Sequence, residues 1–453
     1  MNSLCNPHNS PKEIIKRDLS SIITVPSWMS GIIGFLLWFP GVGFPVLENQ
    51  YLQPAEILVL GWMFFIAFPR ACIFWDFKIN RYLLIMTGGM LASWIISTLF
   101  SVSPSKSSIY LSYYITFILP WMFLLFQIAI SGLLLVKFIH GFIFGACVST
   151  CVGLAQLMLG DRLFKLVNNI NFSLIYGLNK ASGFTPEASI LAGLLIISLA
   201  IILLLLSSES HRIYFLKMQA SSLLTDRSKL FIILFFLMTG LFSTLSTSVI
   251  IIIPAIVLFI LIMMRRYLSF LKKILIVCLL ISIIILFYFF VWLQRSSADT
   301  SGSMLMRGAS MIIGAKIALE NWTIGVGLGM TKDIIAEPVL QLLSRWGDVK
   351  LWIGASSKTG VDSFPLHLLA EQGFLAFILL TIAGYWILSS YKKISSMEQN
   401  EMITMDIVIA FVSFIVGVAS AGYRGLFHLW IFFPFAAAVH SSVDKADVQV
   451  DSK

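Results

Sequence analysis

The sequence predicts an all-α polytopic membrane protein, and both its composition and the spacing of its apolar runs support this. Hydrophobic residues make up 58% of the 453 residues, charged residues make up 12%, and the mean hydropathy is +0.92. A typical water-soluble domain has about 45–50% apolar and about 25% charged residues. We therefore expect residues 1–453 to form a single integral membrane domain.

Apolar runs long enough to cross a bilayer recur along the chain and are expected to form transmembrane helices. A helix of about 20 apolar residues spans the ~30 Å hydrocarbon core. About 12 runs of roughly 17–25 residues meet this length. They lie near 28–47, 55–74, 82–101, 108–130, 133–158, 188–207, 230–246, 248–264, 274–293, 373–391, 404–421 and 425–441.

The Lys and Arg residues of the short connections predict the orientation of these spans. Cytoplasmic connections carry an excess of Lys and Arg, and here basic residues cluster before the first run and after the second, sixth, eighth and tenth. Both termini are therefore predicted to be cytoplasmic. The same asymmetry accounts for the net charge of +9, and no basic stretch interleaved with aromatic residues indicates nucleic-acid binding.

Two long polar segments remain on the opposite face of the membrane: a smaller loop over 160–187 and a large loop over 295–373. Unpaired backbone of this length cannot lie in lipid, so these loops must lie outside the bilayer or line a wet cavity. We expect the chemistry where they meet. The histidines and cysteines show neither H-x-x-x-H nor C-x-x-C spacing, so no metal site and no cofactor are expected.

The smaller loop ends in a junction that leads directly into the sixth run. Gly183 permits a tight bend and Pro186 suits a first helical turn, as in an ordinary capped loop-to-helix junction. That interpretation does not explain the presence of the pair Lys180 and Glu187 at the membrane surface. Both are therefore candidate functional residues.

The large loop begins with a predicted amphipathic helix over 303–320 and continues into a glycine-rich turn. Apolar residues recur at helical spacing, and Arg307 lies on a neighbouring face, which favours a helix lying on the membrane surface. Gly325 and Gly327 follow in the sequence G-V-G-L-G. This turn is not typical of a nucleotide-binding loop, because the G-x-G-x-x-G spacing and the βαβ context are missing.

The large loop closes on a segment that forms the lip of the tenth span. Asp362 or Ser363 would make a good helix N-cap, which accounts for the acid without any catalysis. Capping does not explain three ionisable residues, Asp362, His367 and Glu371, at the edge of a span that continues past Gly373. Ionisable residues at membrane depth are candidates for function.

These three segments, in this order, resemble the O-antigen polymerase and O-antigen ligase superfamily. The resemblance is carried by K-x-S-G-x-x-x-E-x-S, R…G-V-G-L-G and D-S-x(9)-G, and it covers about residues 160–391. It implies a bacterial inner-membrane enzyme of glycosyltransferase class C type with a periplasmic active site. It also implies polyprenyl-diphosphate-linked oligosaccharides, of the undecaprenyl diphosphate kind, as donor and acceptor, with neither metal nor cofactor.

The departures from the family pattern favour the polymerase branch, which makes O-antigen or exopolysaccharide. The ligase branch usually carries a His-Asn pair at the lip, where this chain has Asp362 and Ser363. The arginine that commonly precedes S-G in the first junction is Lys180 here.

The expected chemistry needs cations for the departing diphosphate and a base for the attacking hydroxyl. Arg binds diphosphate oxygens bidentately, so Arg307 is the first candidate, followed by Lys180 and by Arg424 between the last two spans. The base candidates are Asp362 and Glu187, with His367 in reserve. Spacing does not rank the two carboxylates, and no covalent intermediate is needed if the resemblance holds.

Three functions remain open on the sequence: a polysaccharide polymerase, an O-antigen ligase that moves the glycan to lipid A core or another acceptor, and a secondary transporter. The transporter is disfavoured because the chain shows no internal repeat and its ionisable residues lie in loops instead of at broken helices near the midplane. Pairing with a chain-length regulator stays open.

Overall fold

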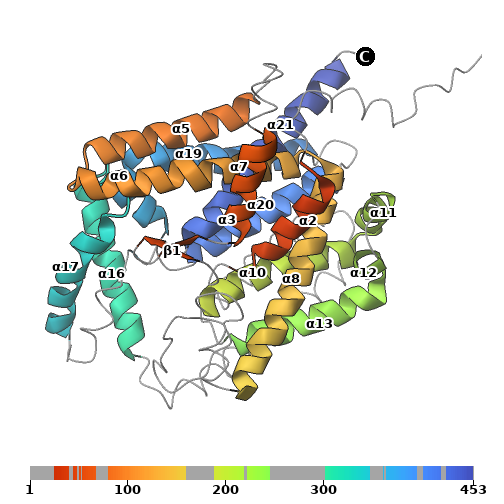
Figure 1. Ribbon diagram of the computed structural model, residues 1–453, viewed down its shortest axis with the longest axis horizontal. Helices are drawn as coiled ribbons and strands as arrows, with labels where there is room; N and C mark the ends of the chain where they lie inside the picture. The colour runs from red at the N-terminus through yellow and green to blue at the C-terminus, as the bar shows by residue number, and fades with distance from the viewer. Residues whose placement is uncertain are drawn as a thin grey trace, which may run out of the picture.

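The computed structural model describes residues 25–39, 44–47, 50–52, 54–67, 80–159, 188–218, 222–244, 301–346, 361, 364–394, 401–419 and 425–451. These residues form a helical bundle with one small hairpin (Figure 1). The helices of the first half are α2 (Ser27–Leu36), α3 (Pro54–Trp62), α5 (Arg81–Leu99), α6 (Pro104–Tyr113), α7 (Leu119–Ala129), α8 (Gly132–Leu159), α10 (Ala188–Ser207), α11 (Glu209–Lys217), α12 (Ser222–Thr225) and α13 (Arg227–Ser243). Those of the second half are α16 (Ser301–Glu320), α17 (Thr331–Trp346), α19 (Phe364–Ile394), α20 (Glu401–Ala419) and α21 (Gly425–Asp451).

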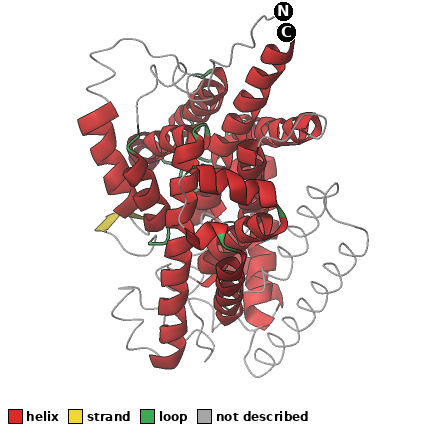
Figure 2. Cartoon of the chain, turned by 90° about the vertical axis from the view of Figure 1, so that its right-hand side faces the viewer, coloured by secondary structure: helices red, strands yellow, loops and turns green. Residues whose placement is uncertain are grey.

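Two short strands and two π-helical turns complete the described fold. The strands β1 (Phe44–Leu47) and β2 (Gln50–Leu52) pair antiparallel, and Figure 2 shows the hairpin at the edge of the helices. π-Helical turns extend α3 over Met63–Ala67 and join α6 to α7 over Tyr114–Ile118. The second turn lets α6 and α7 run as one span.

The described part of the chain contains five helices that are long and apolar enough to cross a membrane. They are Arg81–Leu99, Pro104–Ala129, Gly132–Leu159, Ile190–Ser207 and Pro365–Lys393. The prediction of a helical membrane protein is thereby confirmed at this level. The count of about 12 spans stays a prediction, and the predicted spans 248–264 and 274–293 lie outside the described residues.

The first predicted span, 28–47, is wrong in extent. The helix α2 ends at Leu36, after ten residues, and the end of the apolar run forms β1 instead. Pro40 and Pro45 explain the difference, because a proline in a helix interior removes a hydrogen bond and clashes with the preceding turn. Apolar character alone did not distinguish a full transmembrane helix from a short helix followed by a strand.

The tenth predicted span, 373–391, is longer in the structure. The helix α19 begins at Phe364 and includes the lip that the sequence placed in the loop. A kink at Gly373 divides it into two parts. The lip is therefore helical from Phe364 on, and Gly373 lies inside the element instead of at its start.

The helices α5 and α19 lie side by side and antiparallel along one side of the bundle (Figure 1). Gly89 allows this close packing, because a Cβ at that position would lie 2.7 Å from a methyl carbon of Leu379. Exposed apolar side chains of α5 cover its outer face. They include Leu84, Ile85, Ile95, Ile96 and Leu99.

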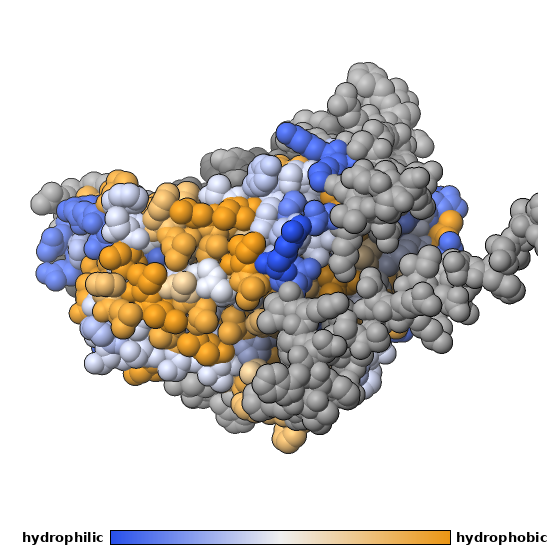
Figure 3. Space-filling model, turned by 90° about the horizontal axis from the view of Figure 1, so that it is seen from above, coloured by the Kyte–Doolittle hydropathy of each residue, from blue (hydrophilic) through white to orange (hydrophobic). Residues whose placement is uncertain are grey.

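Polar side chains gather at both ends of the pair formed by α5 and α19. Arg81 and Ser97, which mark the two ends, are sixteen residues apart in α5, or about 24 Å along a helix. This distance is close to the ~30 Å hydrocarbon thickness. Figure 3 shows the same pattern on the surface, with an orange hydrophobic area between blue hydrophilic ends.

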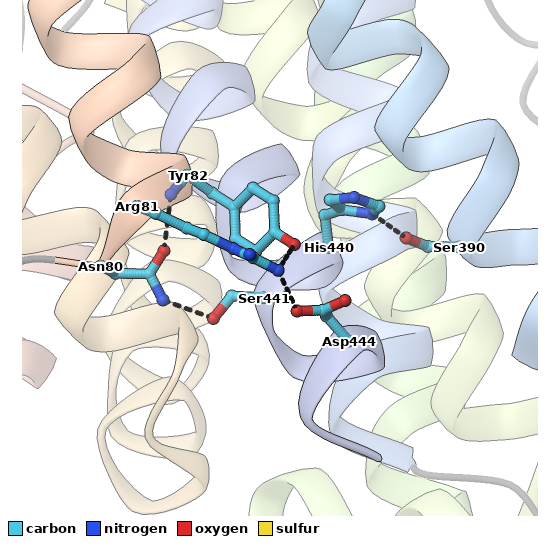
Figure 4. Close-up of polar contacts among 7 residues, drawn as sticks. All are labelled: Asn80, Arg81, Tyr82, Ser390, His440, Ser441 and Asp444. Atoms are coloured by element: carbon cyan, nitrogen blue, oxygen red, sulfur yellow. Dashed lines mark hydrogen bonds and ion pairs between the residues drawn. The ribbon is translucent and has the colours of Figure 1, made fainter. Parts of the chain in front are cut away.

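One of these polar ends is the Arg81 cluster, drawn in Figure 4 with residues from α5, α19 and α21. The Arg81 guanidinium lies 2.5 Å from Asp444 Oδ2 and donates to the Tyr82 hydroxyl at 2.6 Å. Asn80 caps α5 by accepting from the Tyr82 amide at 2.9 Å, and it donates to Ser441 Oγ at 2.6 Å. The cluster joins the beginning of α5 to the end of α21.

Candidate functional site

The opposite polar end holds the candidate site, which is built around the kink at Gly373. The backbone there has φ 70° and ψ −165°, a left-handed conformation that glycine adopts without steric cost. A kink leaves carbonyl groups of the preceding turn without their helical partners. Here the amides of Val326 and Gly327 donate to the carbonyls of Ala370 and Glu371 at 2.8 and 3.2 Å.

The glycine-rich turn between α16 and α17 supplies these amides and is shaped to fit the kink. Gly325, Gly327 and Gly329 all have positive φ, at 83°, 108° and 72°. A Cβ on Gly325 would collide with the main chain of Glu371, and a Cβ on Gly373 would lie 2.5 Å from the carbonyl carbon of Ile324. The structure thus brings together Gly325, Gly327 and Gly373, which the sequence marked as loop-shaping in two separate motifs.

A stripe of serines, two on α5 and one just after its end, holds the kink and the turn from the other side. Ser97 Oγ donates to the Glu371 carbonyl, Ser93 Oγ donates to the Gln372 carbonyl at 3.2 Å, and Ser101 Oγ donates to the Val326 carbonyl at 3.1 Å. The sequence analysis missed these serines. Their spacing of four residues, along and just beyond an apolar helix, was the available signal.

The carboxylate of Glu371 is buried at the beginning of α17. Its Oε1 accepts from the hydroxyl of Thr331 at 2.6 Å and from the amide of Thr331 at 3.4 Å. The first amides of a helix have no partner within the helix, and the positive end of the helix dipole favours an anion there. Glu371 therefore caps α17 from a different helix.

His367 lies one turn before Glu371 on α19 and completes the same group. Its Nδ1 is 3.3 Å from Thr331 Oγ1, and its Nε2 is 3.5 Å from Glu371 Oε2. The exposed fraction of His367 is 3%. The structure thus places this reserve base in the interior, facing Glu371, where a bound substrate would not reach it without rearrangement.

The helix α16 is packed onto the lip through Gly314. A Cβ at this glycine would lie 2.5 Å from a methyl carbon of Val361, the residue that directly precedes Asp362 in the chain. Arg307 lies seven residues before Gly314 in α16, which is about two turns. The helix that carries Arg307 thus contacts the residue before Asp362 at a point about two turns from Arg307.

The predicted amphipathic character of α16 is present, but it is divided between two faces. Small and aliphatic residues, including Ala309, Ile317 and Ala318, pack against α17 and the lip. Ile312 and Leu319, from the stripe predicted to contact the membrane, are exposed by 53% and 73%. An exposed apolar face remains available for lipid.

Most of the other predicted site residues lie outside the described part of the chain. This applies to Asp362, Glu187, Lys180, Arg424 and Gly183 and to the side chain of Arg307. Their roles stay predictions. Within the described residues, no three His, Cys, Asp or Glu side chains are grouped as a metal ion would need.

Comparison of the chain with protein-family models, with curated proteins and with solved structures found no match.

Proposed function

We propose that this protein is a polysaccharide polymerase, an integral membrane glycosyltransferase that acts at the periplasmic face of a bacterial inner membrane. It transfers a growing glycan from a polyprenyl-diphosphate carrier to the free end of another lipid-linked repeat unit. The membrane-embedded helical fold is consistent with a lipid-linked substrate, because both the donor and the acceptor are anchored in the bilayer.

The packing of α16 on the lip of α19 is the observation that supports this proposal best. Gly314 against Val361 sets the helix that carries Arg307 beside the chain that leads into Asp362. A transferase of this class needs a cation at the leaving diphosphate and a base at the attacking hydroxyl on opposite sides of one anomeric carbon. The contact of the helix that carries Arg307 with the residue before Asp362 supports a site shared by the two candidates.

The reaction requires one bond to form and one to break at the anomeric carbon. The acceptor hydroxyl oxygen attacks this carbon while the bond from the carbon to the diphosphate oxygen breaks, with inversion. Asp362 or Glu187 takes the hydroxyl proton, a role that typically contributes about 10²–10⁴-fold to the rate. Arg307 stabilises the negative charge that develops on the diphosphate, assisted by Lys180 and Arg424.

The glycan profile of a deletion strain tests the proposal. A polymerase deletion leaves single repeat units on the carrier lipid, whereas a ligase deletion leaves full chains on the carrier. A normal glycan in the deletion strain would refute both activities.

Complementation then tests the residues. Arg307→Ala and Asp362→Asn should fail to restore polymer at normal expression, and Arg307→Lys should restore it in part, because a point charge does not reproduce the guanidinium fork. Lys316→Ala is the matched control on the same helix, since among the described residues Lys316 makes only an exposed contact of 3.8 Å with Glu320. If Arg307→Ala restores the full amount of polymer, Arg307 is not the diphosphate ligand.

A further inference from the structure

The helix α11 lies at the same end of the bundle as the Arg81 cluster. Its Tyr214 interacts electrostatically with Glu401, where α20 begins, seven residues after the end of α19. The last turns of α19 contribute Ser390 to the cluster. The helix α11 starts directly after α10, and Ser208 caps it by accepting from the amide of His211 at 3.5 Å. It therefore begins where one of the apolar spanning helices ends.

One face of α11 is packed on the bundle, and the opposite face is apolar and exposed. Phe215 is 1% exposed. Gly132 at the beginning of α8 leaves room for Tyr214, since a Cβ on this glycine would collide with the tyrosine hydroxyl. On the opposite side, Ile213 and Leu216 are exposed by 45% and 62%. Figure 1 shows α11 at the edge of the bundle, beside α12, so the described helices do not cover this face.

The helix α13 continues this apolar surface. It packs along α10, and the short helix α12 joins it to α11. It begins at Arg227, and its first turns expose Phe231, Ile232 and Phe235 by 59%, 69% and 76%. Basic residues next to large exposed apolar side chains mark the level at which hydrocarbon meets lipid headgroups. Because α12 contacts both helices, α11 and the beginning of α13 lie at this level.

Three cations of this surface have no anionic partner. Within the described part of the chain, no carboxylate lies within ion-pair distance of Arg212, Lys217 or Arg227. The nearby acids Glu209 and Asp226 lie at helix starts, where the helix dipole favours them. Asp226 accepts there from a main-chain amide of α13 at 2.8 Å. The three cations are therefore free to bind another anion.

Arg212 is the strongest indication of a ligand. Its Nε is buried and has no hydrogen-bond partner among the described residues. Taking a guanidinium out of water without an acceptor costs free energy, and this cost is recovered when an anion binds. The planar guanidinium also matches the oxygens of a phosphate bidentately. The chemistry of Arg212 thus favours a phosphate group as the ligand.

We propose that this surface binds the headgroup of an anionic phospholipid. Arg212 binds the phosphate, Lys217 and Arg227 attract its net negative charge, and Ile213 and Leu216 contact the acyl chains. We call these five residues the α11–α13 surface.

A phospholipid fits this surface better than a soluble phosphate does, because it covers the exposed apolar side chains as well as the cations. The distribution of Lys and Arg predicts that this end of the bundle is cytoplasmic, where anionic lipids give the leaflet a negative potential. The proposal rests on the membrane-embedded fold and not on the polymerase activity.

Arg212→Met is the informative variant, because it keeps an aliphatic side chain and removes the charge. In a non-ionic detergent without added lipid, we expect its melting midpoint to equal or exceed that of the wild type, since the unpaired guanidinium is a cost there. With phosphatidylglycerol added, the order should reverse, because only the wild type gains the full binding free energy. A purely structural arginine would instead give the variant a lower midpoint in both conditions.

Two further ligands separate an anionic lipid from other sources of phosphate. Phosphatidylcholine with the same acyl chains has no net charge and should raise the wild-type midpoint less than phosphatidylglycerol does. Glycerol 3-phosphate carries the phosphate without acyl chains and should leave the midpoint unchanged at the same concentration. Arg212→Lys keeps the charge without the planar fork, so it should retain part of the response to phosphatidylglycerol.

Native mass spectrometry with phosphatidylglycerol measures the size of each contribution. Arg212→Met should weaken binding by roughly tenfold or more, as expected for the loss of charge-assisted hydrogen bonds. Lys217→Gln and Arg227→Gln should each weaken it by about fivefold, the factor that corresponds to ~1 kcal/mol per cation near an anionic surface. Lys217 is exposed, so its variant keeps the test available if Arg212→Met does not fold. The matched control is Lys316→Gln, at the other end of the bundle, which should bind as the wild type does.

Three results would overturn the proposal. A midpoint of Arg212→Met below that of the wild type in lipid-free detergent would make Arg212 a structural residue. Equal responses of the wild type to phosphatidylglycerol and phosphatidylcholine would show an ordinary lipid contact. An equal response to glycerol 3-phosphate would identify a site for a soluble phosphate. No glycan substrate is used, so these results are independent of the polymerase proposal.

Discussion

The hydroxyl of Ser97 donates to the main-chain carbonyl of Glu371 and joins α5 to the kink of α19 across 274 residues of sequence. The same carbonyl accepts from the amide of Gly327 at 3.2 Å. One oxygen therefore connects a transmembrane helix, the kink and the glycine-rich turn. The arrangement makes the candidate site a continuation of the transmembrane bundle and not a separate flexible loop.

Gly373→Ala should be strongly destabilising. A non-glycine residue at φ 70° and ψ −165°, a region that is essentially restricted to glycine, costs about 1–3 kcal/mol, and the new Cβ would lie 2.6 Å from the Thr323 carbonyl oxygen. Gly384→Ala is the control in the same helix, because a Cβ there meets nothing within 4 Å. The melting midpoint in detergent should fall for Gly373→Ala and stay equal or rise for Gly384→Ala. Equal midpoints would contradict the kink geometry.

Ser97→Ala should cost about 1 kcal/mol of stability, the typical net value of one hydrogen bond. The cost stays moderate because the Glu371 carbonyl keeps its bond from Gly327. Ser112→Ala provides a comparison, since its exposed hydroxyl bonds only to the Ser108 carbonyl one turn earlier at 2.9 Å. Thermal melting should separate the two variants, and a larger loss for Ser112→Ala would argue against the role of the serine stripe.

The two ends of the pair formed by α5 and α19 should be accessible from opposite sides of the membrane. Cysteines replacing Lys316 in α16 and Lys392 at the end of α19, each in a cysteine-free background, report the two ends. An impermeant thiol reagent should label position 316 in intact cells and position 392 only after permeabilisation, because Lys and Arg mark the cytoplasmic side. The reverse pattern would invert the predicted orientation.

Asn80→Ala should destabilise more than Asp444→Asn. Asn80 caps α5 and bonds to Ser441, and loss of a cap alone costs about 1 kcal/mol. The ion pair between Arg81 and Asp444 is 68% and 38% exposed, and such pairs contribute about 0–1 kcal/mol. Melting midpoints of the two variants test this order, and a larger loss for Asp444→Asn would reverse it.

Asp444 also gives this end of the bundle a pH dependence with a definite sign. Burial raises the pKa of Asp444, but hydrogen bonds with Tyr82 and Arg81 and the charge of Arg81 outweigh it, so the pKa is lowered overall. The small stability gained from the pair is present above the unfolded pKa and is lost as the pH falls through the folded one. Asp444→Asn should remove this loss of stability at low pH, measured as the melting midpoint against pH. If the midpoint of the variant falls at low pH as it does in the wild type, other groups cause the loss.

Much of the architecture followed from the sequence because it depends on local properties. Length and hydropathy identified α5, α8 and α10 with ends within two residues of those observed. Helical periodicity identified α16, and the glycine spacing marked Gly325 and Gly327 as a turn. In the apolar run around Pro40 and Pro45, hydropathy favours a helix whereas the prolines disfavour one. The predicted helix was too long there.

The sequence alone determined that this is a helical membrane protein, because hydropathy acts residue by residue, and it predicts two polar loops on one face from the distribution of Lys and Arg. Only the tertiary structure decided that the glycine-rich turn caps the kink at Gly373, that Ser97 supports it, and that His367 is buried against Glu371. These contacts join segments that no local pattern relates. The kink leaves carbonyl groups without helical partners, and buried carbonyl groups must be hydrogen-bonded. Their donors come from segments that only the tertiary packing brings close.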